Sequence, residues 1–159
     1  MVGGLVTGDL GQFNSGELRF AGRVNERLTL QDGTIVMPSM VENALKLSPF
    51  ISDALVFGAG RAHLGCLVMM EPDVLEGWAQ ARDLAGNFAA LVQSADVREL
   101  LQTEMDRVSR TAKVVLGCFA VIDRRLELGD PELTAMMQLR RNVVLAGYAD
   151  LIEAMFRAD

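Results

Sequence analysis

The residues best suited to nucleophilic or metal chemistry in this chain are two cysteines and one histidine. Cys66 and Cys118 each lie inside an apolar run, GCLVMM and GCFAVI, and neither belongs to a CxxC or Cys/His cluster. A reactive thiol needs a neighbouring base or positive charge, and only His63 lies near enough in the sequence to be a candidate. The pattern favours reduced core cysteines and a surface histidine, with too few soft ligands for zinc. We therefore expect no metal site.

The segment GAGRAHLG, residues 58–65, has some likeness to a phosphate-binding glycine loop. Its glycines, Gly58, Gly60 and Gly65, do not satisfy GxGxxG, and the apolar run that follows comes too soon for a helix. A turn between paired strands is therefore the favoured interpretation.

The elements that would position these residues are strands in the first part of the chain. GQFNSGELRFAG and RLTLQDGTIVMP each predict a β-hairpin, with turns at residues 14–16 and 32–33. Pro38 is expected to begin a short helix. The apolar runs 51–59 and 65–71 are expected to form a central antiparallel pair.

Helices are expected to dominate the second part of the chain. The spacing of apolar residues predicts helices from residue 73 to about 84 and from 96 to about 111. A strand, CFAVID, then leads through a loop at 129–131 to a final amphipathic helix. Its expected apolar face comprises Val144, Tyr148, Leu151, Ile152 and Met155. The predicted class is α+β: a small, largely antiparallel sheet covered by helices and preceded by a β-hairpin.

Composition and charge exclude several functions. A chain of 159 residues with 50% hydrophobic content suits one globular domain, or a domain with a short appendage. A net charge of −6 opposes binding to nucleic acid, and no zinc-finger or RNP-type motif is present. No apolar stretch reaches the roughly 18 residues of a membrane span, and no signal peptide is recognisable. We expect a cytoplasmic protein.

Several segments, in order, resemble one family. TGDLG at 7–11 and LRFAGR at 18–23 are similar to the ribose-binding and hinge region of AMP-forming (adenylate-forming) acyl-CoA synthetases. The segment MPSMVENALKLSPFISDALVFGAGRAHLGCLV, residues 37–68, resembles the long-chain fatty acid-CoA ligases of that family. ELTAMMQLRRNVV, residues 132–144, is similar to their C-terminal loop-and-helix motif. The resemblance covers nearly the whole chain.

The resemblance implies a two-step reaction. A fatty acid attacks ATP to give acyl-AMP and pyrophosphate, and CoA then displaces AMP to form a thioester. Residues 1–24 would be the tail of an N-terminal adenylation domain, and residues 25–159 a lid that swings between two poses. ATP/AMP, CoA and Mg²⁺ with the ATP would bind the parent enzyme and not this chain alone. The isolated chain is not expected to be catalytically complete, and the parent enzyme could also associate peripherally with a membrane.

Two residues match the family's nucleotide-binding positions. Asp9 corresponds to an aspartate that accepts hydrogen bonds from the adenylate ribose, and a carboxylate can accept two donors at once. From its position alone, Asp9 is also a plain turn or cap residue at a strand start. Arg23 corresponds to an arginine near the same ribose or phosphate, and the alternative is a solvated arginine after a strand.

The hinge and the CoA-approaching hairpin also have counterparts. Asn25 lies where the family usually has an aspartate or lysine hinge residue, and asparagine tolerates unusual backbone angles. Gly33 lies in the hairpin that approaches CoA, where the lack of a side chain admits the thiol arm. The alternative for Gly33 is a plain hairpin glycine.

The clearest departure from the family lies in LTAMMQLRR. The family loop carries a lysine that stabilises negative charge during adenylation, and this chain has Gln138 at that position. An amide donates hydrogen bonds but supplies no charge. The only lysines are Lys46 and Lys113, so a shift in alignment does not restore the missing residue. We therefore expect impaired adenylation, whereas thioester formation would not need this loop.

Three functions remain open from the sequence. The chain is the lid of an active long-chain fatty acid-CoA ligase, or the lid of a degenerate ligase that binds nucleotide or CoA without adenylating. The third hypothesis is a free-standing lid-like domain that acts as a nucleotide/CoA-binding or interaction module without catalysis. Acyl chain length, the thiol acceptor and the oligomeric state are not determined by the residues present.

Overall fold

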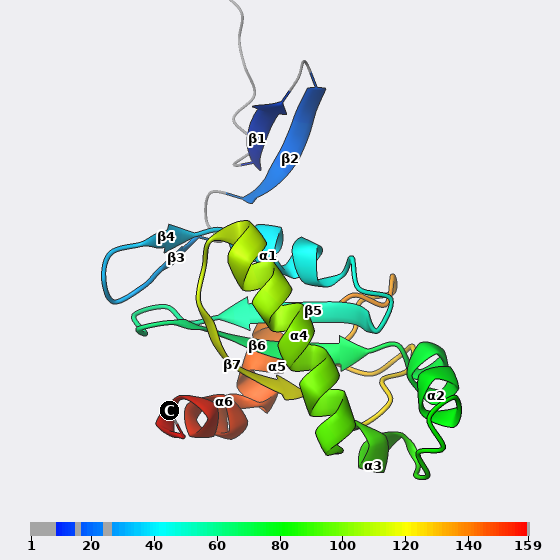
Figure 1. The fold of residues 1–159 in the computed structure, drawn as a ribbon. Coiled ribbons are helices and arrows are strands. Elements are labelled where there is room, and N and C mark those ends of the chain that lie inside the picture. Colours follow the sequence, from blue (N-terminus) through cyan, green and yellow to red (C-terminus); the bar gives the residue numbers. More distant parts are fainter. Residues whose placement is uncertain (1–8, 15–16, 24–26, 159) are drawn as a thin grey trace, which may run out of the picture.

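The computed structural model describes the backbone of residues 9–14, 17–23 and 27–158, and the side chains of residues 27–158. Figure 1 shows an α+β fold, as predicted. The β-strands are β1 (Asp9–Asn14), β2 (Glu17–Arg23), β3 (Leu28–Thr29), β4 (Ile35–Val36), β5 (Ile51–Phe57), β6 (Leu64–Met70) and β7 (Leu116–Val121). The helices are α1 (Pro38–Leu45), α2 (Pro72–Gln80), α3 (Phe88–Val92), α4 (Ala95–Ala112), α5 (Arg141–Gly147) and α6 (Ala149–Arg157).

The centre of the fold is a three-stranded sheet in the order β5-β6-β7. β5 and β6 pair antiparallel, with Val56 opposite Cys66, which confirms the predicted central pair. β7 joins β6 in parallel, after the crossover through α2, α3 and α4. β1 pairs antiparallel with β2, and β3 with β4, so the pairing is antiparallel apart from the single β6-β7 ladder among the described strands.

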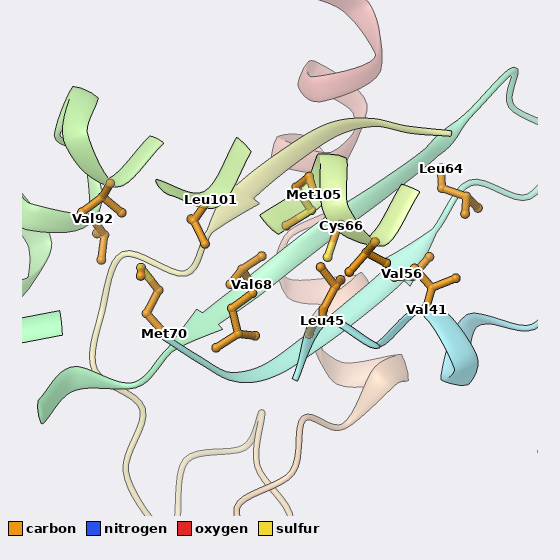
Figure 2. Close-up of a cluster of buried hydrophobic side chains, with 14 of the residues drawn as sticks. Val41, Leu45, Val56, Leu64, Cys66, Val68, Met70, Val92, Leu101 and Met105 are labelled. Carbon is orange, nitrogen blue, oxygen red and sulfur yellow. The ribbon is translucent and has the colours of Figure 1, made fainter. Parts of the chain in front are cut away.

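Both faces of the sheet are covered, which explains why β5 and β6 are apolar along nearly their whole length. One face packs against α1 and α4, and α4 runs across it in Figure 1. Figure 2 shows this layer, where Leu45, Leu101 and Met105 close over Val56, Cys66 and Val68. The opposite face, with Leu55, Phe57 and Leu67, packs against α5 and α6. Alternate residues of β5 and β6 thus belong to two hydrophobic clusters, one on each face of the sheet.

Local signals account for several helix boundaries. Pro38 and Pro72 stand at the first turns of α1 and α2, where the missing N–H costs nothing. The hydroxyl of Ser94 accepts a hydrogen bond from the Val97 N–H and caps the start of α4. α4 ends at Lys113, whose φ of 55° is left-handed.

The C-terminal region differs from the prediction. The expected single helix is two helices that meet at Tyr148, whose backbone (φ −109°, ψ 19°) is not helical. Tyr148 packs against two hydrophobic clusters, one around Leu67 and one around Ile122, and the helix is interrupted at this residue. Leu151, assigned to the apolar face, is 39% exposed. The short helix α3 was not predicted, and α2 ends at Gln80, several residues before the expected position. No helix among the described residues has the length and apolarity needed to cross a membrane.

Candidate functional site

The loop that carries Gln138 is a closed, ordered turn. Leu133 and Leu139 form an isolated antiparallel bridge at its base, and the Thr134 N–H donates to the Gln138 carbonyl at 2.8 Å. The Thr134 hydroxyl accepts from the N–H groups of Met136 (3.3 Å) and Gln138 (3.2 Å). Met137 adopts a left-handed φ of 60° to complete the turn. Gln138 is exposed and closes the turn opposite Thr134, one residue before the bridge.

The base of this loop is fixed by burial and by an arginine. Leu133 is buried with Ile122 and Leu126 in a cluster against which Leu139 also packs. Upstream, Arg124 donates to Glu132 Oε1 at 2.7 Å and to Asp130 Oδ2 at 2.9 Å. The Arg124 hydrogen bond lowers the pKa of the Glu132 carboxyl below its ordinary value. The exposed tip therefore stands on a rigid base.

A buried aspartate joins the loop to the central sheet. Asp53, in β5, is 7% exposed, and its Oδ2 accepts the Leu139 N–H at 2.7 Å. Its Oδ1 accepts the Ala54 N–H at 2.8 Å and lies 3.6 Å from the Lys46 ammonium. Sequence reasoning missed Asp53, although a single carboxylate within the apolar run ISDALVF was a usable signal.

A second polar pair covers the free edge of β5. Glu42 Oε1 accepts the Val56 N–H at 2.8 Å, and Arg141 Nη1 donates to the Val56 carbonyl at 2.8 Å. Arg141 also pairs directly with Glu42. Burial raises the pKa of the Glu42 carboxyl, and the Arg141 charge acts in the opposite direction. Arg141 is thus a structural residue, because its guanidinium is engaged on β5 and α1 and is not available beside Gln138.

The space between α1, the start of β5 and the loop is a polar hollow of about 310 Å³. Its ionisable lining residues are Glu42, Lys46, Asp53 and Arg141, and Gln138 stands at its loop side. Arg140 points elsewhere and lines a different hollow with Leu128 and Thr134. Lys46 and Arg141 supply positive charge, and Gln138 supplies a hydrogen-bond donor, so the lining could contact an anion. Among the described residues, no group of three or more His, Cys, Asp and Glu side chains is placed to hold a metal ion.

The hairpin with Gly33 lies at the other end of β5. Gly33 has a φ of +86°, which favours glycine, and no atom lies within 4 Å of a Cβ placed there, so the surrounding space is open. Hydrogen bonds from Gln31 N–H to the Arg61 carbonyl and from Gly60 N–H to the Thr29 carbonyl, both 2.8 Å, fasten this hairpin to the turn after β5. The β3-β4 hairpin with Gly33 and the loop with Gln138 are therefore attached near opposite ends of β5.

Two of the remaining predicted site residues lie in the N-terminal hairpin. Asp9 and Arg23 stand opposite each other in the β1-β2 ladder, a pairing that the sequence did not indicate. Asn25, the expected hinge residue, lies outside the described residues.

The thiols and the histidine take structural positions. Neither cysteine forms a disulfide in the described part of the chain, and burial raises the pKa of the Cys66 thiol above its ordinary value. Cys118 is half-buried. His63 is half-buried, stacks on Phe156 with ring centroids 5.3 Å apart, and fills the space above Gly117. The histidine is therefore packed to a greater extent than the expected surface residue.

The small sheet thus has an ordered polar loop attached near one end of its edge strand and a glycine hairpin attached near the other. Residues 25–159 match the family model of the AMP-binding enzyme C-terminal domain, and the chain belongs to that family.

Similar proteins agree with this assignment. The chain is 29% identical over 160 positions to the long-chain-fatty-acid--CoA ligase FadD15 of Mycobacterium tuberculosis, covering 96% of the chain and 26% of that protein. It is 25% identical to the peroxisomal long chain acyl-CoA synthetase 6 of Arabidopsis thaliana, covering 98% of the chain and 23% of that protein. The chain thus spans about a quarter of the length of these relatives.

The fold is also shared with solved structures. The adenylation domain of a carboxylate reductase from Mycobacterium chelonae superposes with a TM-score of 0.69 at 26% identity, over 96% of this chain and 23% of that one. The corresponding domain from Segniliparus rugosus, solved with AMP and a co-purified carboxylic acid, gives a TM-score of 0.67 at 22% identity, over 96% and 23% of the two chains.

Proposed function

We propose that this chain is the lid of a long-chain fatty acid-CoA ligase in which adenylation is impaired. The parent enzyme would convert ATP, fatty acid and CoA to acyl-CoA, AMP and pyrophosphate, with Mg²⁺ accompanying ATP. Its N-terminal adenylation domain would lie in the same polypeptide and include residues 1–24. Asp9 and Arg23 would then contact the adenylate, and Asn25 would be the hinge.

The observation that supports the proposal is the attachment of the Gln138 loop and the Gly33 hairpin near opposite ends of β5. The Gln138 loop is fastened to Asp53 near the start of the strand, and the Gly33 hairpin is fastened to Gly60 and Arg61 just beyond its end. A rotation of the domain would therefore present one loop and then the other to the same reacting carbonyl. Adenylation and thioester formation need such an exchange, because each step requires different groups around that carbonyl.

The impairment follows from the chemistry of the residue at position 138. Gln138 is exposed on an ordered loop, and it corresponds in the sequence to the family's lysine, which would stabilise the developing charge on the α-phosphate. Losing one preorganised donor of that kind lowers a rate about 100-fold, and loss of a full charge lowers it further. Arg141 does not compensate, because its guanidinium is engaged by Glu42 and the Val56 carbonyl.

Two half-reactions of the complete polypeptide test the proposal. Acyl-dependent ATP-pyrophosphate exchange measures adenylation, and thioester formation from preformed acyl-AMP measures the second step. We expect slow exchange and ordinary thioester formation in the wild type, and exchange raised about 100-fold by Gln138→Lys.

A matched control adds the same charge elsewhere. Gln80→Lys, at the exposed end of α2, should leave exchange unchanged. An equal response of the two variants would show that the loop position has no special role. Absence of both half-reactions would reject the ligase assignment and favour a binding or interaction module. A native polypeptide no longer than this chain would lead to the same conclusion.

A further inference from the structure

We infer that Lys46 supplies the positive charge for residual adenylation that the loop at Gln138 lacks. This inference rests on the proposed function and names a catalytic residue for its first step. Lys46 directly follows α1, on a different element from the loop that carries the family's lysine. Sequence comparison alone would pass over it for that reason.

The geometry places Lys46 beside the loop. Its ammonium lies 3.6 Å from Asp53 Oδ1, and the other oxygen of that carboxylate holds the N–H of Leu139, the neighbour of Gln138. Lys46 and Gln138 line the same polar hollow. The Asp53 carboxylate thus contacts both the Lys46 ammonium and the backbone at the base of the loop.

The ammonium is held loosely enough to move. The 3.6 Å approach to Asp53 is longer than a hydrogen bond, and the Lys46 side chain is 33% exposed. Asp53 keeps two charge-assisted hydrogen bonds, from Ala54 and Leu139, when Lys46 turns away. The flexible four-carbon stem of lysine allows its charge to follow an anion that enters the hollow.

Other cations on this face are less suited to the task. Arg141 is fixed by Glu42 and by the backbone of Val56. Arg140 lines a separate hollow, beside Leu128. Lys113 stands at the C-terminal end of α4, on a different element from those that form the hollow. Lys46 is therefore the lysine placed to serve the loop.

The proposed step balances without proton transfer from Lys46. A carboxylate oxygen of the fatty acid forms a bond to the α-phosphorus of ATP, and the bond from that phosphorus to the bridging oxygen of the β-phosphate breaks. Pyrophosphate leaves with the electron pair. The Lys46 ammonium stabilises negative charge on the α-phosphate oxygens and keeps its proton throughout.

The test uses lysine variants of the complete polypeptide. Lys46→Met should lower acyl-dependent ATP-pyrophosphate exchange about tenfold or more, while thioester formation from preformed acyl-AMP stays unchanged. The control, Lys113→Met, removes the same charge from the other lysine and should leave both half-reactions unaltered. Lys46→Arg should retain part of the exchange rate because it keeps the charge.

A double variant separates a catalytic from a merely structural role. When Lys46 supplies charge, Lys46→Met combined with Gln138→Lys should exchange at least as fast as the wild type, since the charge returns at the loop. When Lys46 only steadies Asp53, the single variant should increase amide hydrogen exchange at Leu139, and the added lysine should not restore activity.

The outcomes also separate this inference from the proposed function. Equal exchange rates for Lys46→Met and Lys113→Met would overturn the role of Lys46 and leave the ligase assignment intact. If the wild type forms thioester but shows no ATP-pyrophosphate exchange, the role of Lys46 is also overturned, because there is no residual adenylation for it to support. The ligase assignment then remains intact. Loss of both half-reactions in the wild type would reject the inference together with the function on which it rests.

Discussion

The attachment of the Gln138 loop to the sheet can be tested through Asp53→Asn, which keeps the shape of the side chain and removes its charge. The two carboxylate oxygens accept one backbone N–H each, from Ala54 and Leu139. An asparagine side chain offers one acceptor oxygen and one NH₂ group. Either the Ala54 N–H or the Leu139 N–H must then face the asparagine NH₂ group, which is also a donor, at a buried position.

The magnitude follows from these contacts. A hydrogen bond to a charged group contributes about 1.5–3 kcal/mol, and an unsatisfied buried donor costs about 1–3 kcal/mol. We expect Asp53→Asn to lower the free energy of unfolding by about 3 kcal/mol, since one contact is lost and the other is weakened. For a domain of this size, that change corresponds to a fall of about 10 °C in Tm.

Two measurements on the chain check this expectation. Urea unfolding gives the change in stability, and amide hydrogen exchange reports the local opening at Leu139 and Ala54. The matched control is Asp73→Asn, since the Asp73 side chain is 80% exposed and makes a 3.4 Å surface pair with Arg125. If both variants unfold within about 0.5 kcal/mol of the wild type, as surface substitutions do, the loop does not depend on Asp53.

Three further predictions concern the core, the hairpin and the charged base of the loop. Leu101 is fully buried in α4, so Leu101→Ala should lower the free energy of unfolding, measured with urea, by about 3 kcal/mol. A loss below about 1 kcal/mol would contradict the packing shown in Figure 2. Gly33→Ala should cost about 1 kcal/mol, because its φ of +86° disfavours a Cβ, and an unchanged midpoint would count against that strain. Arg124→Gln should raise the pKa of Glu132 in an NMR titration. Because the wild-type pKa is lowered, Glu132 stabilises the fold above its ordinary pKa and loses that contribution as the pH falls; an unmoved titration would refute the role of Arg124.

Much of the fold was predictable because its signals are local. Turn residues identified the β3-β4 hairpin, proline positions identified the starts of α1 and α2, and apolar spacing identified α4. The division of the last helix at Tyr148 was not predictable from periodicity. Val144 and Ile152 keep helical spacing on either side of the break, and only the packing of Tyr148 between two clusters reveals it.

The sequence by itself determined the α+β class, the family resemblance and the absence of a lysine at position 138, because these depend on residue types and their order. It could not determine that Asp53 anchors the loop, that Lys46 shares its hollow, or that Arg141 is engaged by Glu42. Asp53 and Leu139 are 86 positions apart, and Glu42 and Arg141 are 99 apart. Such pairs meet only when β5, α1 and the loop pack together. The tertiary structure therefore decided which charges stand beside Gln138 and which are already neutralised.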